Sequence, residues 1–88
     1  MYVLYLLQSQ KDHSFYIGIT GNLKRRLSEH NKRLSRYTKY KRPLMLIYCE
    51  VYRSSKDALT RERQLKKHKT GWIKLRERLQ NSILREQS

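Results

Sequence analysis

The first seven residues, MYVLYLL, form a continuous run of apolar and aromatic side chains that limits which folds the chain can adopt. Because the run does not alternate between apolar and polar residues, it suits a strand that is buried on both faces. Polar residues from Gln8 to Ser14 end the run, and β-prone residues resume from Phe15 to Ile19. The sequence therefore predicts two strands that are joined by a hairpin turn.

The middle of the chain predicts one helix and then a third strand. Small polar residues at 20–22 can cap a helix. The spacing of the apolar residues then predicts an amphipathic helix over residues 22–33, with a stripe formed by Leu23, Leu27 and Leu34. Residues 44–52, LMLIYCEVY, are typical of a strand, in which we expect Cys49 to be buried.

The last third of the chain predicts two further helices. Ser54 and Ser55 can cap the first of them, and residues 69–71 are typical of its end. Apolar residues from Trp72 onward then indicate a final amphipathic helix. We therefore predict an α/β (α+β) fold, in which helices flank a small three-stranded antiparallel sheet in the order β-β-α-β-α-α. Residues 1–80 would form the domain and residues 81–88 a basic C-terminal tail.

The charge of the chain points to a polyanionic partner. Lys and Arg total 21 against 7 Asp and Glu, which gives a net charge of +14. Such a charge steers a protein toward nucleic acid, although small basic proteins without catalytic activity share it. The cations that we expect to bind nucleic acid are Lys24, Arg25, Arg33, Lys39, Arg42, Lys66 and Lys67.

Other features of the sequence indicate the cellular compartment in which we expect the protein. The apolar run at residues 1–7 is far shorter than the roughly 20 residues that span a bilayer, and no charged segment precedes it. A single cysteine excludes an internal disulfide and a zinc site of four thiolates. We therefore expect a cytoplasmic protein without a membrane partner. The sequence carries no signal for an oligomeric state.

Two tyrosines are predicted to share one face of the sheet. A symmetric hairpin centred between residues 10 and 11 would set Tyr5 opposite Tyr16, with Gly18 two residues further along the same face. A glycine within a strand often marks a close approach by another backbone or by a ligand. The alternative without a function is an aromatic pair beside a β-bulge.

Three polar residues lie close to the apolar stripes of the predicted helices. Arg26 and His30 are four residues apart and so share one side of the first helix, while Glu62 lies on the stripe of the second. A partly buried arginine needs a carboxylate or a phosphate. A carboxylate at Glu62 fits either a salt bridge to Arg26 or a divalent cation such as Mg²⁺. His30 alone would also suit a hydrogen-bonded core histidine.

Linked motifs in this order resemble the GIY-YIG nuclease domain, specifically its short stand-alone bacterial branch. The motifs, which span about residues 1–70, are Val3-Leu4-Tyr5, Tyr16-Ile17-Gly18, Arg26-Leu27 with Glu29-His30-Asn31, and Arg61-Glu62-Arg63. The first triplet is Val-Leu-Tyr where the family has Gly-Ile-Tyr. The resemblance implies catalytic positions at Tyr5, Tyr16, Arg26, His30 and Glu62.

The resemblance also implies roles for these residues. Tyr5 or Tyr16 would activate the attacking water, Arg26 would bind the scissile phosphate, and Glu62 would hold the metal. A family asparagine in a late helix has only Asn81 as a candidate here, in a segment where the resemblance has faded.

Two functions from different classes follow. The first is an endonuclease that cuts DNA with Mg²⁺ or Mn²⁺, with weak specificity or with a preference for branched, nicked or single-stranded forms, in repair or recombination. The second is a nucleic-acid-binding module that keeps the fold but cuts slowly or not at all. RNA is a less favoured partner, for which Tyr37 and Tyr40 could stack on unpaired bases.

Overall fold

The computed structural model describes residues 1–32 and 40–85, which form one antiparallel sheet and three helices. The elements in chain order are β1 (Tyr2–Ser9), β2 (Phe15–Thr20), α1 (Leu23–Asn31), β3 (Leu44–Tyr52), α2 (Ser55–Lys67) and α3 (Lys69–Arg78). The strands are ordered β2-β1-β3, so β1 is central and pairs with both neighbours. The predicted element order and the antiparallel sheet are confirmed.

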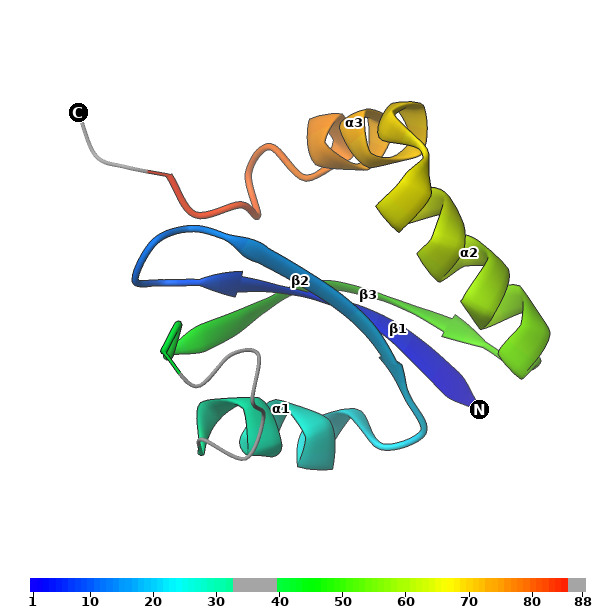
Figure 1. The fold of residues 1–88 in the computed structure, drawn as a ribbon, viewed down its shortest axis with the longest axis horizontal. Helices are drawn as coiled ribbons and strands as arrows, with labels where there is room; N and C mark the ends of the chain where they lie inside the picture. Colours follow the sequence, from blue (N-terminus) through cyan, green and yellow to red (C-terminus); the bar gives the residue numbers. More distant parts are fainter. Residues whose placement is uncertain (33–39, 86–88) are drawn as a thin grey trace.

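The helices cover both faces of the sheet, with α1 on one side and α2 and α3 on the other (Figure 1). Side chains of β1 alternate between the two faces. Leu4 and Leu6 are buried with leucines of α2 and α3, whereas Tyr5 and Leu7 are buried with Leu44 and the leucines of α1. This double coverage is why residues 2–7 of β1 are all apolar or aromatic, since each fully buried leucine contributes about 1.5–3 kcal/mol.

The β1–β2 hairpin has a different register from the symmetric one. Tyr5 pairs with Gly18, and Tyr16 pairs with Leu7, so the expected Tyr5–Tyr16 pair is wrong. The cause is the turn, in which Ser9 Oγ accepts hydrogen bonds from the backbone N–H groups of residues 11 and 12 and His13 adopts φ 65°. This arrangement moves the centre of the hairpin toward β2, but the two tyrosines still lie on the same face.

The helices begin at capping residues. Asn22 Oδ1 accepts a hydrogen bond of 3.0 Å from the backbone N–H of Arg25 and starts α1, which ends at Asn31 within the predicted range 22–33. Ser54 caps α2 as predicted. The third helix begins at Lys69, so the expected end of α2 at residues 69–71 and the start at Trp72 are wrong.

The break between α2 and α3 falls at His68, whose extended backbone separates the two helices. The backbone N–H of Gly71 donates to the carbonyl of His68 at 3.1 Å, which makes Gly71 part of the first turn of α3. A Cβ at Gly71 would lie 3.4 Å from the carbonyl oxygen of Gln64. A side chain at this position would thus make only ordinary contact, and Gly71 lies in the first turn of α3 instead of ending α2.

Cys49 is exposed, which contradicts its expected burial. It pairs with Tyr5 and lies on the face that α1 covers. However, α1 packs near Leu44 and Leu46, at the opposite end of β3, and Val51 beyond Cys49 is 57% exposed. The exposure of Cys49 thus results from a short helix on a long edge strand.

A charged cluster joins α2 to β3 on the opposite face. Glu50 accepts hydrogen bonds from the hydroxyls of Tyr48 and Tyr52 and from Arg61 Nε at 3.1 Å. Burial opposes the ionisation of Glu50, but these hydrogen bonds outweigh it and hold the pKa of its carboxyl below the usual value. Burial and then the hydrogen bond to Glu50 raise the pKa of Tyr52 to about 12. Through Arg61 the cluster fixes the orientation of α2, and therefore that of Glu62, which directly follows Arg61 in the chain.

Part of the segment that the sequence sets apart as a tail lies against the domain. The Leu84 backbone N–H donates to Gln8 Oε1 at 2.7 Å, and Gln8 Nε2 donates back to the Leu84 carbonyl at 3.2 Å. Ile83 packs on the cluster beneath α3. Among the residues that the structure describes, no helix has the length and apolar character to cross a bilayer.

Candidate active site

One cleft brings together all five residues that the sequence singles out for catalysis. The cleft has a volume of about 570 Å³ and follows the edge strand β2, with α1 on one side and α2 on the other. Its polar lining comes from Tyr5, Tyr16, Arg26, His30, Glu62 and Lys66. Residues from four elements thus meet at one place, although they span most of the chain.

Tyr5 lies at the buried end of the cleft and is 4% exposed. Its hydroxyl lies 3.2 Å from His30 Nε2 and accepts a hydrogen bond of 3.3 Å from Arg26 Nε. The ring lies over Gly18, where an added Cβ would come within 2.3 Å of the hydroxyl oxygen. Gly18 is therefore required so that the phenol can reach both side chains of α1.

Arg26 and His30 reach Tyr5 from successive turns of α1, which confirms that they share one side of the helix. The end of this helix is held to β3 by Asn31, whose side chain donates to the carbonyl of Leu44 at 3.0 Å and accepts from its N–H at 2.7 Å. The position of Arg26 and His30 thus depends on a backbone anchor outside the cleft.

His30 is buried, at 5% exposure. Burial and then the charge of Arg26 lower the pKa of the His30 imidazole, while Glu29 opposes this effect. The imidazole is therefore neutral at neutral pH. A neutral ring beside a phenol can take up a proton during a reaction.

Arg26 has its carboxylate partner on its own helix. Arg26 Nη1 donates to Glu29 Oε2 at 2.9 Å, and Glu29 also pairs with Arg25 at 3.5 Å. Hydrogen bonds to Tyr5 and then Glu29 raise the pKa of Arg26 further above its usual value. Among the described residues Arg26 makes no ion pair with Glu62, so the alternative of an Arg26–Glu62 salt bridge is wrong.

Glu62 and Tyr16 lie on the more open part of the cleft. The Glu62 side chain is 22% exposed and accepts a hydrogen bond of 3.3 Å from Lys66 Nζ, one turn along α2. Tyr16 accepts a hydrogen bond of 3.4 Å from Ser14 Oγ. A carboxylate and a phenol at the mouth of the cleft are accessible to a substrate.

The cleft provides one carboxylate for a metal ion. Among the described residues no group of three or more His, Cys, Asp or Glu side chains could hold a metal. This donor set fits Mg²⁺, which is often held by one or two carboxylates together with water and substrate phosphate. Glu62 is the residue that would hold the ion.

Of the described cations that are predicted to bind nucleic acid, Lys66 lines this cleft. Lys24 and Arg25 are exposed on α1, and Lys66 and Lys67 are exposed on α2. Arg42 is half-buried and donates to the carbonyl of Asn31 at 3.3 Å. Arg33, Lys39 and the aromatic Tyr37 lie outside the described residues.

Glu29, the ion-pair partner of Arg26, is not among the site residues that the sequence predicts. The signal in the sequence is that Arg26 and Glu29 are three positions apart on one predicted helix, a spacing that brings their side chains together. Asn81 is exposed and does not line this cleft.

Comparisons with known proteins agree with this arrangement. The family model described as the GIY-YIG catalytic domain matches residues 1–76. A UPF0213 protein of Streptococcus pyogenes serotype M3 is 41% identical over 76 residues, which are 85% of this chain and 78% of the relative. A UPF0213 protein of Staphylococcus haemolyticus is 40% identical over 57 residues, which are 64% of this chain and 70% of the relative. No solved structure matches the chain significantly.

The central antiparallel sheet lies between helices, and polar residues of four elements surround a cleft at its edge strand, which defines a small α+β domain. The chain belongs to the GIY-YIG family, which is a family of nucleases. The resemblance seen in the sequence motifs is thereby confirmed.

Proposed function

We propose that this protein is a metal-dependent endonuclease that hydrolyses phosphodiester bonds of DNA. The observation that carries the proposal is the single cleft lined by Tyr5, Tyr16, Arg26, His30 and Glu62. The net charge of +14 supports a polyanionic substrate. Weak or structure-selective cutting during repair or recombination in the cytoplasm is the role we propose for it.

Tyr5 is the residue that we assign to activation of the attacking water. In the tautomer whose Nε2 is unprotonated, His30 accepts the hydroxyl proton of Tyr5 across 3.2 Å. Tyr5 then takes a proton from the water that attacks phosphorus. The hydrogen bond from Arg26 Nε stabilises the negative charge on the phenol oxygen as the proton leaves. This contact to a cation favours Tyr5 over Tyr16 as the general base.

Arg26 also binds the scissile phosphate. A guanidinium has five N–H donors, of which Tyr5 and Glu29 engage Nε and Nη1. Among the residues that the structure describes, none engages Nη2, so its donors can bind a phosphate oxygen, and the side chain is 36% exposed at the cleft. Because Glu29 and Tyr5 restrict its rotamers, Arg26 loses little further freedom when the phosphate binds.

Glu62 would hold the divalent cation that the GIY-YIG family generally uses. A bound Mg²⁺ or Mn²⁺ supplies Lewis-acid stabilisation of the charge on the phosphate and the leaving oxygen. Tyr16 at the mouth of the cleft would bind a water or a phosphate oxygen through its hydroxyl. Lys66, which contacts Glu62, contributes a positive charge to the cleft.

A non-catalytic nucleic-acid-binding module is the second candidate, because Lys24, Arg25 and Lys67 are exposed cations that would bind phosphates without chemistry. The variant Glu62→Ala separates the two functions. A nuclease loses cutting with this change and keeps its salt-sensitive binding, whereas a binding module has no cutting to lose.

The test uses supercoiled plasmid and labelled branched, nicked and single-stranded oligonucleotides, each with Mg²⁺, with Mn²⁺ and with chelator. We expect metal-dependent cutting that Glu62→Ala and Arg26→Ala both abolish. Asp57→Ala removes an exposed carboxylate of the same helix as Glu62, and Arg53→Ala removes an exposed cation that does not line the cleft, so both controls should retain cutting. Binding without metal-dependent cutting by the unmodified protein would overturn the proposal.

A further inference from the structure

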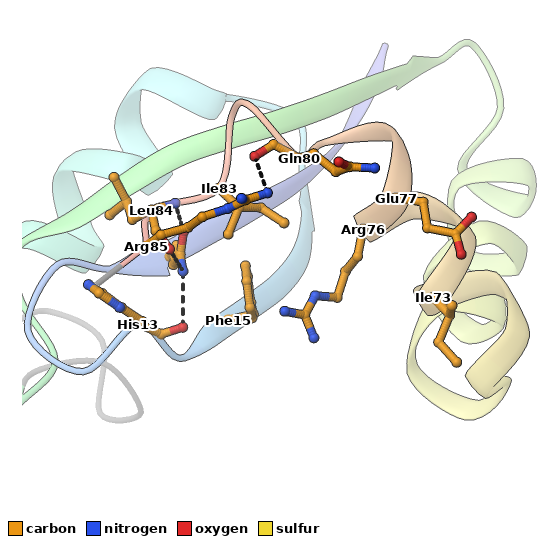
Figure 2. Close-up of a pocket in the computed structure, with 10 residues that line it drawn as sticks. His13, Phe15, Ile73, Arg76, Glu77, Gln80, Ile83, Leu84 and Arg85 are labelled. Carbon is orange, nitrogen blue, oxygen red and sulfur yellow. Dashed lines mark hydrogen bonds between the residues drawn. The ribbon is translucent and has the colours of Figure 1, made fainter. Parts of the chain in front are cut away.

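A groove continues from the candidate active site along β2 toward α3. Three hollows share lining residues along this path. Phe15 lines all of them, and Ile17 and Lys66 line both the catalytic cleft and the middle hollow, which also contains Trp72. The last hollow has a volume of about 610 Å³ and lies between α3 and the C-terminal segment (Figure 2). A ligand in the cleft could therefore extend past Phe15 to Arg76.

The middle of the groove carries an aromatic platform. The rings of Phe15 and Trp72 meet edge to face, with centroids 5.1 Å apart and an interplanar angle of 73°. Both side chains are only half-buried, although they also pack on the core cluster. Aromatic faces that remain partly open beside cations are typical of sites at which unpaired bases stack.

A cation lies directly on this platform. The guanidinium carbon of Arg76 is 5.4 Å from the Phe15 centroid and 5.9 Å from the Trp72 centroid. In the described part of the chain, its guanidinium makes no hydrogen bond or ion pair. In Figure 2 the Arg76 side chain extends toward Phe15. The carboxylate of Glu77, which also lines this hollow, points away from Phe15. The donors of Arg76 are thus held in position and remain available to an anion.

An aromatic platform with a fixed cation beside it suits a nucleotide chain, in which each base is accompanied by a phosphate. Bases of a duplex stack on one another and do not reach a half-buried platform, whereas bases of a single strand do. The net charge of +14 complements a polyanion. A single strand is therefore the ligand that the groove fits.

We infer that this groove binds a single-stranded segment of the DNA next to the scissile phosphate, with a base stacked on one ring of the Phe15–Trp72 pair and a phosphate on Arg76. The inference rests on the proposed function for the identity of the ligand. It adds a binding site outside the catalytic cleft and explains how a small domain could select DNA with an unpaired strand.

Trp72 is the single tryptophan of the chain, so its fluorescence reports on this site alone. The experiment titrates the Glu62→Ala protein, in chelator, with an oligo(dT) strand and with a blunt DNA duplex. We expect the single strand to quench Trp72 strongly and the duplex to quench it little. Arg76→Gln, in the same background, should weaken oligo(dT) binding by about 5- to 10-fold and lower the salt slope by about 0.7.

Arg78→Gln is the matched control, because it removes the same charge from the same helix at a position that does not line the groove. It should weaken binding less than about 2-fold, as a general charge effect does. Circular dichroism of each variant verifies the fold. Equal quenching by duplex and single strand, or equal losses from Arg76→Gln and Arg78→Gln, would overturn the inference.

The same titration separates this inference from the proposed function, because it requires no cutting. Metal-dependent cutting by the unmodified protein without quenching of Trp72 would overturn the groove and leave the nuclease standing. Quenching and an effect of Arg76→Gln, without cutting of any substrate, would support the groove and overturn the nuclease.

Discussion

Replacing Gly18 by alanine should damage the site through one contact. The new Cβ would lie 2.3 Å from the hydroxyl oxygen of Tyr5 and 2.5 Å from Cζ, whereas ordinary contact begins at 3.4 Å. Since Gly18 belongs to a paired strand, the phenol must move, by roughly 1 Å. Its distances of 3.2 Å to His30 and 3.3 Å to Arg26 are already long, so a shift of this size breaks at least one of the two contacts.

The energetic cost of Gly18→Ala follows from these terms. Overpacking costs about 1–3 kcal/mol, and a broken hydrogen bond adds about 1 kcal/mol. Lower entropy of the unfolded chain offsets about 0.5–1 kcal/mol. We expect a net loss of about 2 kcal/mol, which lowers the Tm of a domain of this size by about 8–16 °C. Cutting should fall by about 100-fold, because a general base displaced by 1 Å loses its alignment.

Thermal unfolding by circular dichroism and plasmid cutting measure the two effects. Gly21→Ala is the matched control, because a Cβ there meets no atom within 4 Å and should leave Tm and cutting nearly unchanged. The variant Tyr5→Leu lacks both clashing atoms, so Gly18→Ala should cost little in that background. An equal loss of Tm in both backgrounds would refute the steric argument.

Three further outcomes are expected. Tyr5→Phe should lower the cutting rate by about 100-fold or more, whereas Tyr16→Phe should lower it by only about 10-fold. Single-turnover rates measure both effects. Equal losses would contradict the assignment of Tyr5 as the general base. The lowered pKa of His30 means that its contribution to stability and to cutting is present above the ordinary value of about 6.5 and is lost as the pH falls through the folded pKa. NMR titration of the histidine ring protons checks that the pKa of His30 lies below its ordinary value. Glu50→Gln should lower the free energy of unfolding by about 2 kcal/mol. Because the pKa of Glu50 is held below its usual value, urea unfolding should show this difference above pH 4.5 and lose it at lower pH.

Local patterns in the sequence were sufficient for the elements themselves. The apolar run of β1, the caps at Asn22 and Ser54, and the β-prone residues 44–52 depend on interactions between neighbours in the chain, which the sequence displays directly. The shared face of Arg26 and His30 follows from helical periodicity in the same way. For this reason the element order and the α+β class were predictable.

Tertiary structure decided the features that depend on contacts between distant residues. The hairpin register was set by hydrogen bonds to Ser9 Oγ, and the exposure of Cys49 by how far α1 extends along β3. The sequence identified Gly18 as a place of close approach, but only the fold showed that the approaching group is the ring of Tyr5. Similarly, the groove toward Arg76 exists because the α2–α3 break at His68 brings Trp72 beside Phe15. Periodicity specifies which side of an element a residue occupies, whereas packing between elements determines which side chains meet there.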